Sequence, residues 1–185
     1  MIDYSRLNNS IEFYETRGFK RIESPWTVTR PVSQITKPKG SHDWTINEKS
    51  KVLVASGEQS FLYMYLKGFL PKGKFQTITP CFRDEIFDEL HTKYFMKNEL
   101  IITDEVNFTQ LDFIVDTAKT FLENEINYKV DIISTENGYD LEVKGMEIGS
   151  YGIRECGYLD WIYGTGLAEP RTSYIKNKLK KNGVS

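Results

Sequence analysis

One segment, residues 80–100, holds the most chemically specific pattern in this sequence. Its charged and aromatic members are Arg83, Glu85, His91, Phe95 and Glu99. If the polar loop between them joins two antiparallel strands, Arg83, Phe95 and Glu99 converge on one patch. There an arginine can bind phosphate, a phenylalanine can stack on a flat ring, and a glutamate can hold an ammonium group. The pattern predicts a site where a nucleotide meets an amino acid; the alternative is a charged hairpin with one buried phenylalanine.

Two shorter patterns add carboxylates and hydroxyls. Ser56 and Glu58 lie between a predicted strand and a predicted helix. Their alternative reading is a helix N-terminus, with Ser56 as the cap and Glu58 favoured by the helix dipole. Glu147 and Ser150 stand three apart on a predicted strand, where a carboxylate can hold Mg²⁺ bound to a triphosphate. The alternative for Glu147 is an edge-strand side chain that faces water.

A glycine-rich turn is predicted before Arg171, at Gly164 and Gly166. Glycines let a backbone approach a ligand closely, and an arginine at a helix start can reach phosphate oxygens. Taken alone, a glycine-rich turn is a weak signal.

The elements that must position these residues follow from periodicity and turn signals. Leu7, Ile11 and Tyr14 fall at helical spacing, and Asn107 can cap a second helix. Residues 27–50 are polar and read as a long loop or flap. A further helix is predicted at 59–70 and a closing helix after Arg171, with strands at 19–23, 52–55, 74–82, 94–103, 128–133, 139–143, 146–153 and 158–163. Because the strands run consecutively through hairpin-like turns, we expect an α+β fold with a mainly antiparallel sheet flanked by helices.

Size and composition limit the possibilities. With 185 residues, 39% of them hydrophobic, the chain can bury one core, so a single domain over residues 1–185 is expected. A net charge of -2 predicts no nucleic-acid binding by bulk attraction, and the lysines of residues 176–181 read as a solvated helix end. Cys81 reads as a small core residue. No run of about 18 apolar residues predicts a membrane span, and the cytoplasm is the expected compartment.

Together, in this order, the motifs resemble those of the class II aminoacyl-tRNA synthetases, most closely the seryl-tRNA synthetases. Residues 79–85 and 91–100 resemble the second motif of that family, and residues 164–172 resemble the third. Residues 54–59 resemble the turn before the second motif in the serine enzymes, and residues 139–150 resemble the Tyr-Asp-Leu-Glu-Val and Glu-Ile-x-Ser segments. The first motif has a weaker counterpart in residues 10–25. The resemblance covers nearly the whole chain.

The resemblance implies a role for each residue. Arg83 would hold the α-phosphate and the substrate carboxylate, and Arg171 would stack on adenine and reach the γ-phosphate, so these two arginines would be catalytic. The other expected ATP contacts are Glu85 on the adenine amino group, Phe95 stacked on adenine, and His91 near the γ-phosphate. Glu147 and Ser150 would bind Mg²⁺, and the amino acid would lie against Ser56, Glu58, Glu99 and Ser150. A homodimer is implied by the resemblance alone.

Departures from the family limit the acceptor. The sequence shows no coiled-coil arm and no anticodon-binding domain, and the loop at residues 86–90 is shorter than the loop that meets the tRNA acceptor end in the family. His91 replaces an arginine, and Pro170 stands where glycine is usual. We therefore expect whole tRNA not to be the acceptor.

Three hypotheses remain open. The first is an ATP-dependent enzyme that activates serine, glycine or alanine as an adenylate and transfers it to a carrier protein, a protein side chain or a small molecule. The second is a non-catalytic paralog that binds nucleotide or amino acid in a regulatory role. The third is a minimal seryl-tRNA synthetase-like tRNA ligase.

Overall fold

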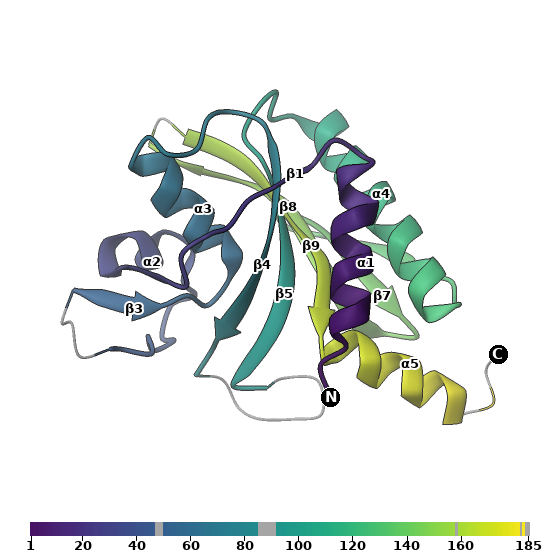
Figure 1. Ribbon diagram of the computed structural model, residues 1–185. Helices are drawn as coiled ribbons and strands as arrows, with labels where there is room; N and C mark the ends of the chain where they lie inside the picture. The colour runs from purple at the N-terminus through teal and green to yellow at the C-terminus, as the bar shows by residue number, and fades with distance from the viewer. Residues whose placement is uncertain (47–49, 85–91, 158, 182, 184–185) are drawn as a thin grey trace.

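A seven-stranded sheet forms the centre of the computed structural model, which describes residues 1–46, 50–84, 92–157, 159–181 and 183 (Figure 1). The helices are α1 (Tyr4–Glu15), α2 (Arg30–Thr36), α3 (Gly57–Leu66), α4 (Phe108–Ile126) and α5 (Arg171–Lys181). The strands are β1 (Lys20–Arg21), β2 (Thr27–Thr29), β3 (Lys51–Leu53), β4 (Lys74–Phe82), β5 (Tyr94–Ile102), β6 (Asp131–Thr135), β7 (Gly138–Val143), β8 (Met146–Cys156) and β9 (Leu159–Glu169). The sheet order is β1-β4-β5-β9-β8-β7-β6; β1 pairs with β4 in parallel, and the other neighbours are antiparallel. The predicted α+β fold with a mainly antiparallel sheet is confirmed.

Helices cover the two faces of the sheet unequally. In Figure 1, α1, α4 and α5 lie on one side, and α2, α3 and the small β2–β3 sheet lie on the other. Side chains of β5 alternate between the two layers, so that Leu100 joins the core under α4 and Ile101 joins the core under α3. This two-residue period sends Phe95, Lys97 and Glu99 to the α3 side, where the pocket lies.

Two helix features predicted from the sequence are present in the structure. Leu7, Ile11 and Tyr14 form the buried stripe of α1. The Asn107 side chain accepts a hydrogen bond from the Gln110 backbone N–H at 3.0 Å and so caps α4.

The long loop predicted for residues 27–50 is wrong in part. It contains β2 and α2, and β2 pairs with β3 in a small antiparallel sheet. Pro31 contributed to the loop interpretation, but it lies in the first turn of α2. The fixed φ of proline suits that turn, and the missing N–H costs no hydrogen bond there.

Other boundaries also shift. The helix predicted at 59–70 runs over Gly57–Leu66, and the strand predicted at 128–133 runs over Asp131–Thr135. The strand predicted at 158–163 continues through the supposed glycine-rich turn to Glu169. Gly164 and Gly166, which were predicted to form a turn before Arg171, therefore lie in a strand.

Candidate active site

One pocket, with a volume of about 310 Å³, opens on the α3 side of the sheet. Its walls come from β5, β8 and β9, from the turn before α3, and from residues 36–43 that follow α2. The pocket brings together every described residue that the sequence assigned to the site: Ser56, Glu58, Arg83, Phe95, Glu99, Glu147, Ser150 and Arg171. Glu85 and His91 lie outside the described residues.

Arg83 and Phe95 form one end of the pocket. Arg83 directly follows β4, and Phe95 lies near the start of β5, which pairs with β4. The Arg83 guanidinium carbon lies 5.1 Å from the centroid of the Phe95 ring. Arg83 Nε donates to the Ala55 carbonyl at 3.1 Å. A cation and an aromatic face are thus fixed side by side, which suits a phosphate attached to a planar base.

Gln59 links this end to the segment after α2. Its Oε1 accepts from the Ala55 N–H at 2.8 Å, and its Nε2 donates to the Ser33 carbonyl at 3.2 Å. Ser33 Oγ in turn donates to Asp43 at 2.8 Å, and Lys37 pairs with Asp43 at 3.2 Å. Through Ala55, this buried network holds the carbonyl that orients Arg83.

Glu147, Ser150 and Arg171 form a second group. Arg171 Nη1 donates to Glu147 Oε1 at 2.8 Å. On a regular strand, residues three apart point to opposite faces. The register of β8 against β7 shifts at this point, with Leu141 opposite Gly149 and Glu142 opposite Glu147. That bulge returns both Glu147 and Ser150 to the pocket face.

The donor atoms there fit a hard cation. Glu147 offers carboxylate oxygen, and Ser150, which lies opposite Asp140 in the β7–β8 register, offers a hydroxyl. The described residues contain no group of three or more His, Cys, Asp and Glu side chains that could hold a metal ion by themselves. Mg²⁺ commonly takes one or two carboxylates and completes its shell with substrate phosphates and water. The residues therefore fit Mg²⁺ that arrives with a nucleotide.

A buried carboxylate, that of Glu99, also lines the pocket. The Glu99 residue is 1% exposed, and its Oε1 accepts from Lys97 Nζ at 2.8 Å. Its other oxygen, Oε2, is buried and has no hydrogen-bond partner among the described residues. A buried charged acceptor without a donor is costly, so this atom indicates a ligand that supplies an N–H or O–H.

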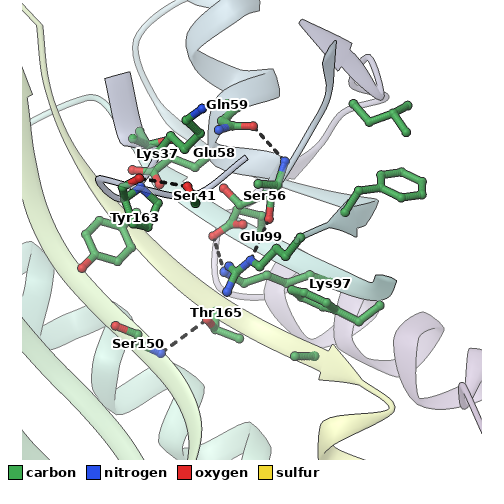
Figure 2. Close-up of a pocket in the computed structure, with 18 of the residues that line it drawn as sticks. Lys37, Ser41, Ser56, Glu58, Gln59, Lys97, Glu99, Ser150, Tyr163 and Thr165 are labelled. Atoms are coloured by element: carbon green, nitrogen blue, oxygen red, sulfur yellow. Dashed lines mark hydrogen bonds and ion pairs between the residues drawn. The ribbon is translucent and has the colours of Figure 1, made fainter. Parts of the chain in front are cut away.

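Glu58 is engaged more fully than the sequence indicated. Its Oε1 accepts from Trp161 Nε1 at 2.7 Å, and its Oε2 pairs with Arg154 (Figure 2 shows Glu58 beside Tyr163). Burial raises the pKa of Glu58, an effect opposed by Arg154 and increased by the nearby Glu99. Both carboxylate oxygens are thus in use before any ligand binds.

Ser56 is the residue that precedes α3, but its side chain makes no capping hydrogen bond. The hydroxyl lines the pocket instead. Next to it, Gly57 allows close packing, because a Cβ there would lie 2.8 Å from Glu99 Cβ and 3.0 Å from Thr79 Oγ1. The helix start therefore fits tightly against the Glu99 side of the pocket.

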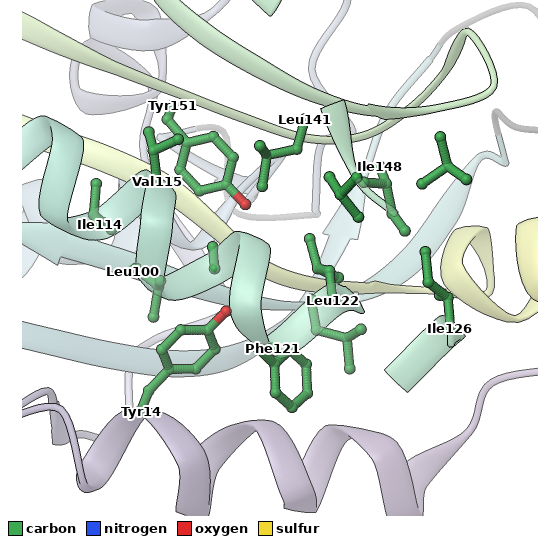
Figure 3. Packing of buried hydrophobic residues seen from close by; sticks show 14 of the residues in the cluster. Tyr14, Leu100, Ile114, Val115, Phe121, Leu122, Ile126, Leu141, Ile148 and Tyr151 are labelled. Atoms are coloured by element: carbon green, nitrogen blue, oxygen red, sulfur yellow. The ribbon is translucent and has the colours of Figure 1, made fainter. Parts of the chain in front are cut away.

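The glycines before Arg171 pack against the core rather than forming a turn. Both lie in β9. A Cβ on Gly164 would lie 2.7 Å from Tyr151 and 2.9 Å from Ile114, and one on Gly166 would lie 2.9 Å from Tyr14 (Figure 3 shows these side chains in the core). The register of β5 against β9 shifts beside Gly166, because Asn98 lies opposite Leu167 and Glu99 lies opposite Thr165. Glycines at these two positions therefore leave room for the core side chains that pack against β9.

Several pocket residues escaped the sequence interpretation: Lys37, Asp43, Gln59, Lys97, Arg154, Tyr163 and Thr165. Lys97 had a usable signal, because it stands midway between Phe95 and Glu99 on one strand face. Arg154 had one too, because it stands four residues after Ser150 on a regular part of β8 and so shares its face. Cys81 is confirmed as a buried core residue, and burial raises the pKa of its thiol to about 11.

No protein-family model and no curated protein matches this sequence. Within the described ranges, every helix is too short or too polar to span a bilayer.

Solved structures do match. Two structures of pyrrolysyl-tRNA synthetase from Desulfitobacterium hafniense superpose with TM-scores of 0.74 and 0.76, at 16% and 15% identity. Each match covers 95% of this chain and 69% of the synthetase chain. The cytoplasmic serine-tRNA ligase of Naegleria fowleri, solved in complex with AMP, matches with a TM-score of 0.68 at 16% identity, over 91% of this chain and 46% of the ligase. This chain therefore has the fold of the class II aminoacyl-tRNA synthetase catalytic core.

Proposed function

We propose that this protein activates a small amino acid, namely serine, glycine or alanine, with ATP and Mg²⁺ to give an aminoacyl adenylate and pyrophosphate. The observation that carries the proposal is that one pocket holds two different kinds of binding group. Arg83 beside Phe95 suits a nucleotide, and the unpartnered Oε2 of Glu99 suits an ammonium or hydroxyl group. The synthetase fold supports the proposal, because the solved structures that share it are tRNA synthetases and a tRNA ligase.

In the proposed reaction, the amino-acid carboxylate attacks the α-phosphate of ATP in line with the departing pyrophosphate. The carboxylate oxygen forms a bond to phosphorus, and the bond from phosphorus to the bridging oxygen breaks. Mg²⁺ held by Glu147 and Ser150 would neutralise charge on the phosphates. Arg83 would align the two anions, and Arg171 would stabilise the charge that moves to pyrophosphate. No acid–base residue is required.

The Glu147–Arg171 pair sets a condition on this mechanism. Arg171 is bound to Glu147 at 2.8 Å, and the Glu147 side chain is 45% exposed. The pair is accessible enough for Arg171 to exchange its carboxylate partner for phosphate oxygens, while Glu147 becomes a cation ligand. In this exchange both charges stay paired, Arg171 with phosphate and Glu147 with Mg²⁺, so neither is left uncompensated in the partly buried site.

The acceptor is proposed to be a carrier protein, a protein side chain or a small molecule rather than whole tRNA. The net charge of -2 and the short loop at residues 86–90 support this choice, since tRNA binding relies on a basic surface. A homodimer and a single domain over residues 1–185 are part of the same proposal.

Amino-acid-dependent ATP–pyrophosphate exchange tests the proposal. Purified protein with ATP, Mg²⁺ and each amino acid in turn should exchange label with serine, glycine or alanine. The Arg83→Ala variant should lose about 10²–10³-fold in rate, as expected when one charge-stabilising donor is removed. Arg21→Ala is the matched control, because Arg21 is exposed on β1. Nucleotide or amino-acid binding by calorimetry with no exchange would instead identify a non-catalytic paralog.

A further inference from the structure

Beside Glu58, a cluster of four side chains closes the amino-acid end of the pocket. The cluster consists of Glu58, Arg154, Trp161 and Tyr163. The Arg154 guanidinium carbon lies 4.1 Å from the centroid of the Tyr163 ring while its Nη1 pairs with Glu58. Both partners of Arg154 are thus in place before a ligand enters, and its orientation is fixed.

Gly152 makes this stack possible. It lies opposite Tyr163 in the β8–β9 register, two residues before Arg154 on the same strand face. A Cβ at Gly152 would come within 2.8 Å of the Tyr163 hydroxyl and 2.5 Å of the Asn137 carbonyl. Only glycine lets the Tyr163 ring lie across β8, and only that ring position supports the guanidinium.

Arg154 keeps hydrogen-bonding capacity on the pocket side. Its side chain is 38% exposed and lines the pocket, and among the described residues only its Nη1 has a hydrogen-bond partner. Nε and Nη2 therefore retain donors. In the same pocket, Glu99 Oε2 is a buried acceptor without a hydrogen-bond partner among the described residues. The same end of the pocket thus offers donors and an acceptor.

The charges of this end are balanced. Lys97 and Arg154 carry two positive charges, and Glu58 and Glu99 carry two negative charges. In the proposed reaction the ammonium of the amino acid would approach Glu99 and its carboxylate would approach Arg83. The ammonium would add one positive charge at this end, and a side-chain oxygen of the amino acid would satisfy the remaining donors of Arg154.

We infer that Arg154 determines specificity and selects an amino acid whose short side chain carries an acceptor oxygen, such as a hydroxyl or a carboxamide; this rests on the proposed function. Within the proposed set, serine is then favoured over alanine and glycine, and asparagine is a further ligand of the same class. Arg154 does not touch the reacting atoms, so it acts on selection and not on chemistry.

Calorimetric titration with serine, asparagine and alanine tests the inference without requiring turnover. Serine or asparagine should bind the intact chain at least about 10-fold more tightly than alanine, the lower end of what a hydrogen bond to a charged group supplies. Arg154→Met should reduce this preference to less than about 3-fold. Because Arg154→Met leaves Glu58 buried without its cation, the double variant Glu58→Gln/Arg154→Met removes that charge as well and should show the same loss of preference.

Arg154→Lys separates recognition from charge. It keeps a cation for Glu58 but loses the planar stack on Tyr163, so selectivity should fall while the melting temperature stays near that of the intact chain. Equal binding of alanine and serine, no binding of any of the three, or selectivity that survives the double variant would overturn the inference. Selective binding without pyrophosphate exchange would leave the inference standing and reject the proposed enzymatic function.

Discussion

Glu99 provides the sharpest test of how the pocket holds an amino acid. Replacing it with glutamine keeps size and shape but removes the charge. The Glu99 side chain is 1% exposed and its Oε2 has no protein partner, so a ligand ammonium or hydroxyl there would make a charged hydrogen bond away from water. Such bonds contribute about 1.5–3 kcal/mol, which corresponds to roughly 10- to 150-fold in affinity.

Glu99→Gln should therefore raise the KM for the amino acid by that factor and leave the KM for ATP within about 3-fold. Initial rates of pyrophosphate exchange, varied in each substrate separately, measure both constants, and thermal unfolding checks the fold. Glu155→Gln is a suitable control because Glu155 is exposed on β8. An unchanged amino-acid KM, or an equal rise for both substrates, would refute the assignment of Glu99 to the amino-acid site.

Three further predictions concern other parts of the account. Phe95→Ala should weaken ATP binding by about 5- to 150-fold, because aromatic stacking on a base contributes about 1–3 kcal/mol; calorimetry with ATP measures this, and unchanged affinity would exclude stacking. Tyr14→Phe should lower the free energy of unfolding by about 1–3 kcal/mol, since it leaves the buried Gly166 carbonyl without the Tyr14 hydroxyl at 2.9 Å; urea unfolding measures this. Burial raises the pKa of Glu58, so amino-acid binding should fall on acidification at a higher pH than for an ordinary glutamate, as Arg154 loses its partner. Glu58→Gln should lack that acid limb. Because the pKa of Glu58 is higher in the folded state than in the unfolded state, the free energy of unfolding should fall as the pH rises through the folded pKa and the buried carboxyl ionises.

The fold was largely predictable because most elements are local in origin. The buried stripe of α1, the Asn107 cap and the paired strands around residues 83–95 all follow from spacing and capping rules. The failures share a cause: Pro31 and Gly164 were read as markers of irregular backbone. Pro31 instead lies in the first turn of α2, and Gly164 makes room for Tyr151 inside a strand. Tertiary contacts decided both positions.

The pocket was predictable only where the strand period applies without interruption. Phe95 and Glu99 share a face on β5 because they stand four apart. Glu147 and Ser150 stand three apart, and the bulge in β8 that brings them together has no signature in their spacing. Arg154 shares the face of Ser150, but its pairing with Glu58 joins β8 to α3 across 96 positions of sequence and depends on how the helix packs on the sheet, which spacing does not reveal.

Direct detection of the adenylate tests the central claim. The purified chain is mixed with Mg²⁺, ATP labelled at the α-phosphate and serine, and the quenched products are separated by chromatography and identified by mass. The account predicts a labelled seryl adenylate that requires serine and is lost in Arg83→Ala and Arg171→Ala. ATP left intact with serine, glycine and alanine alike, by protein that binds both ligands, would contradict it.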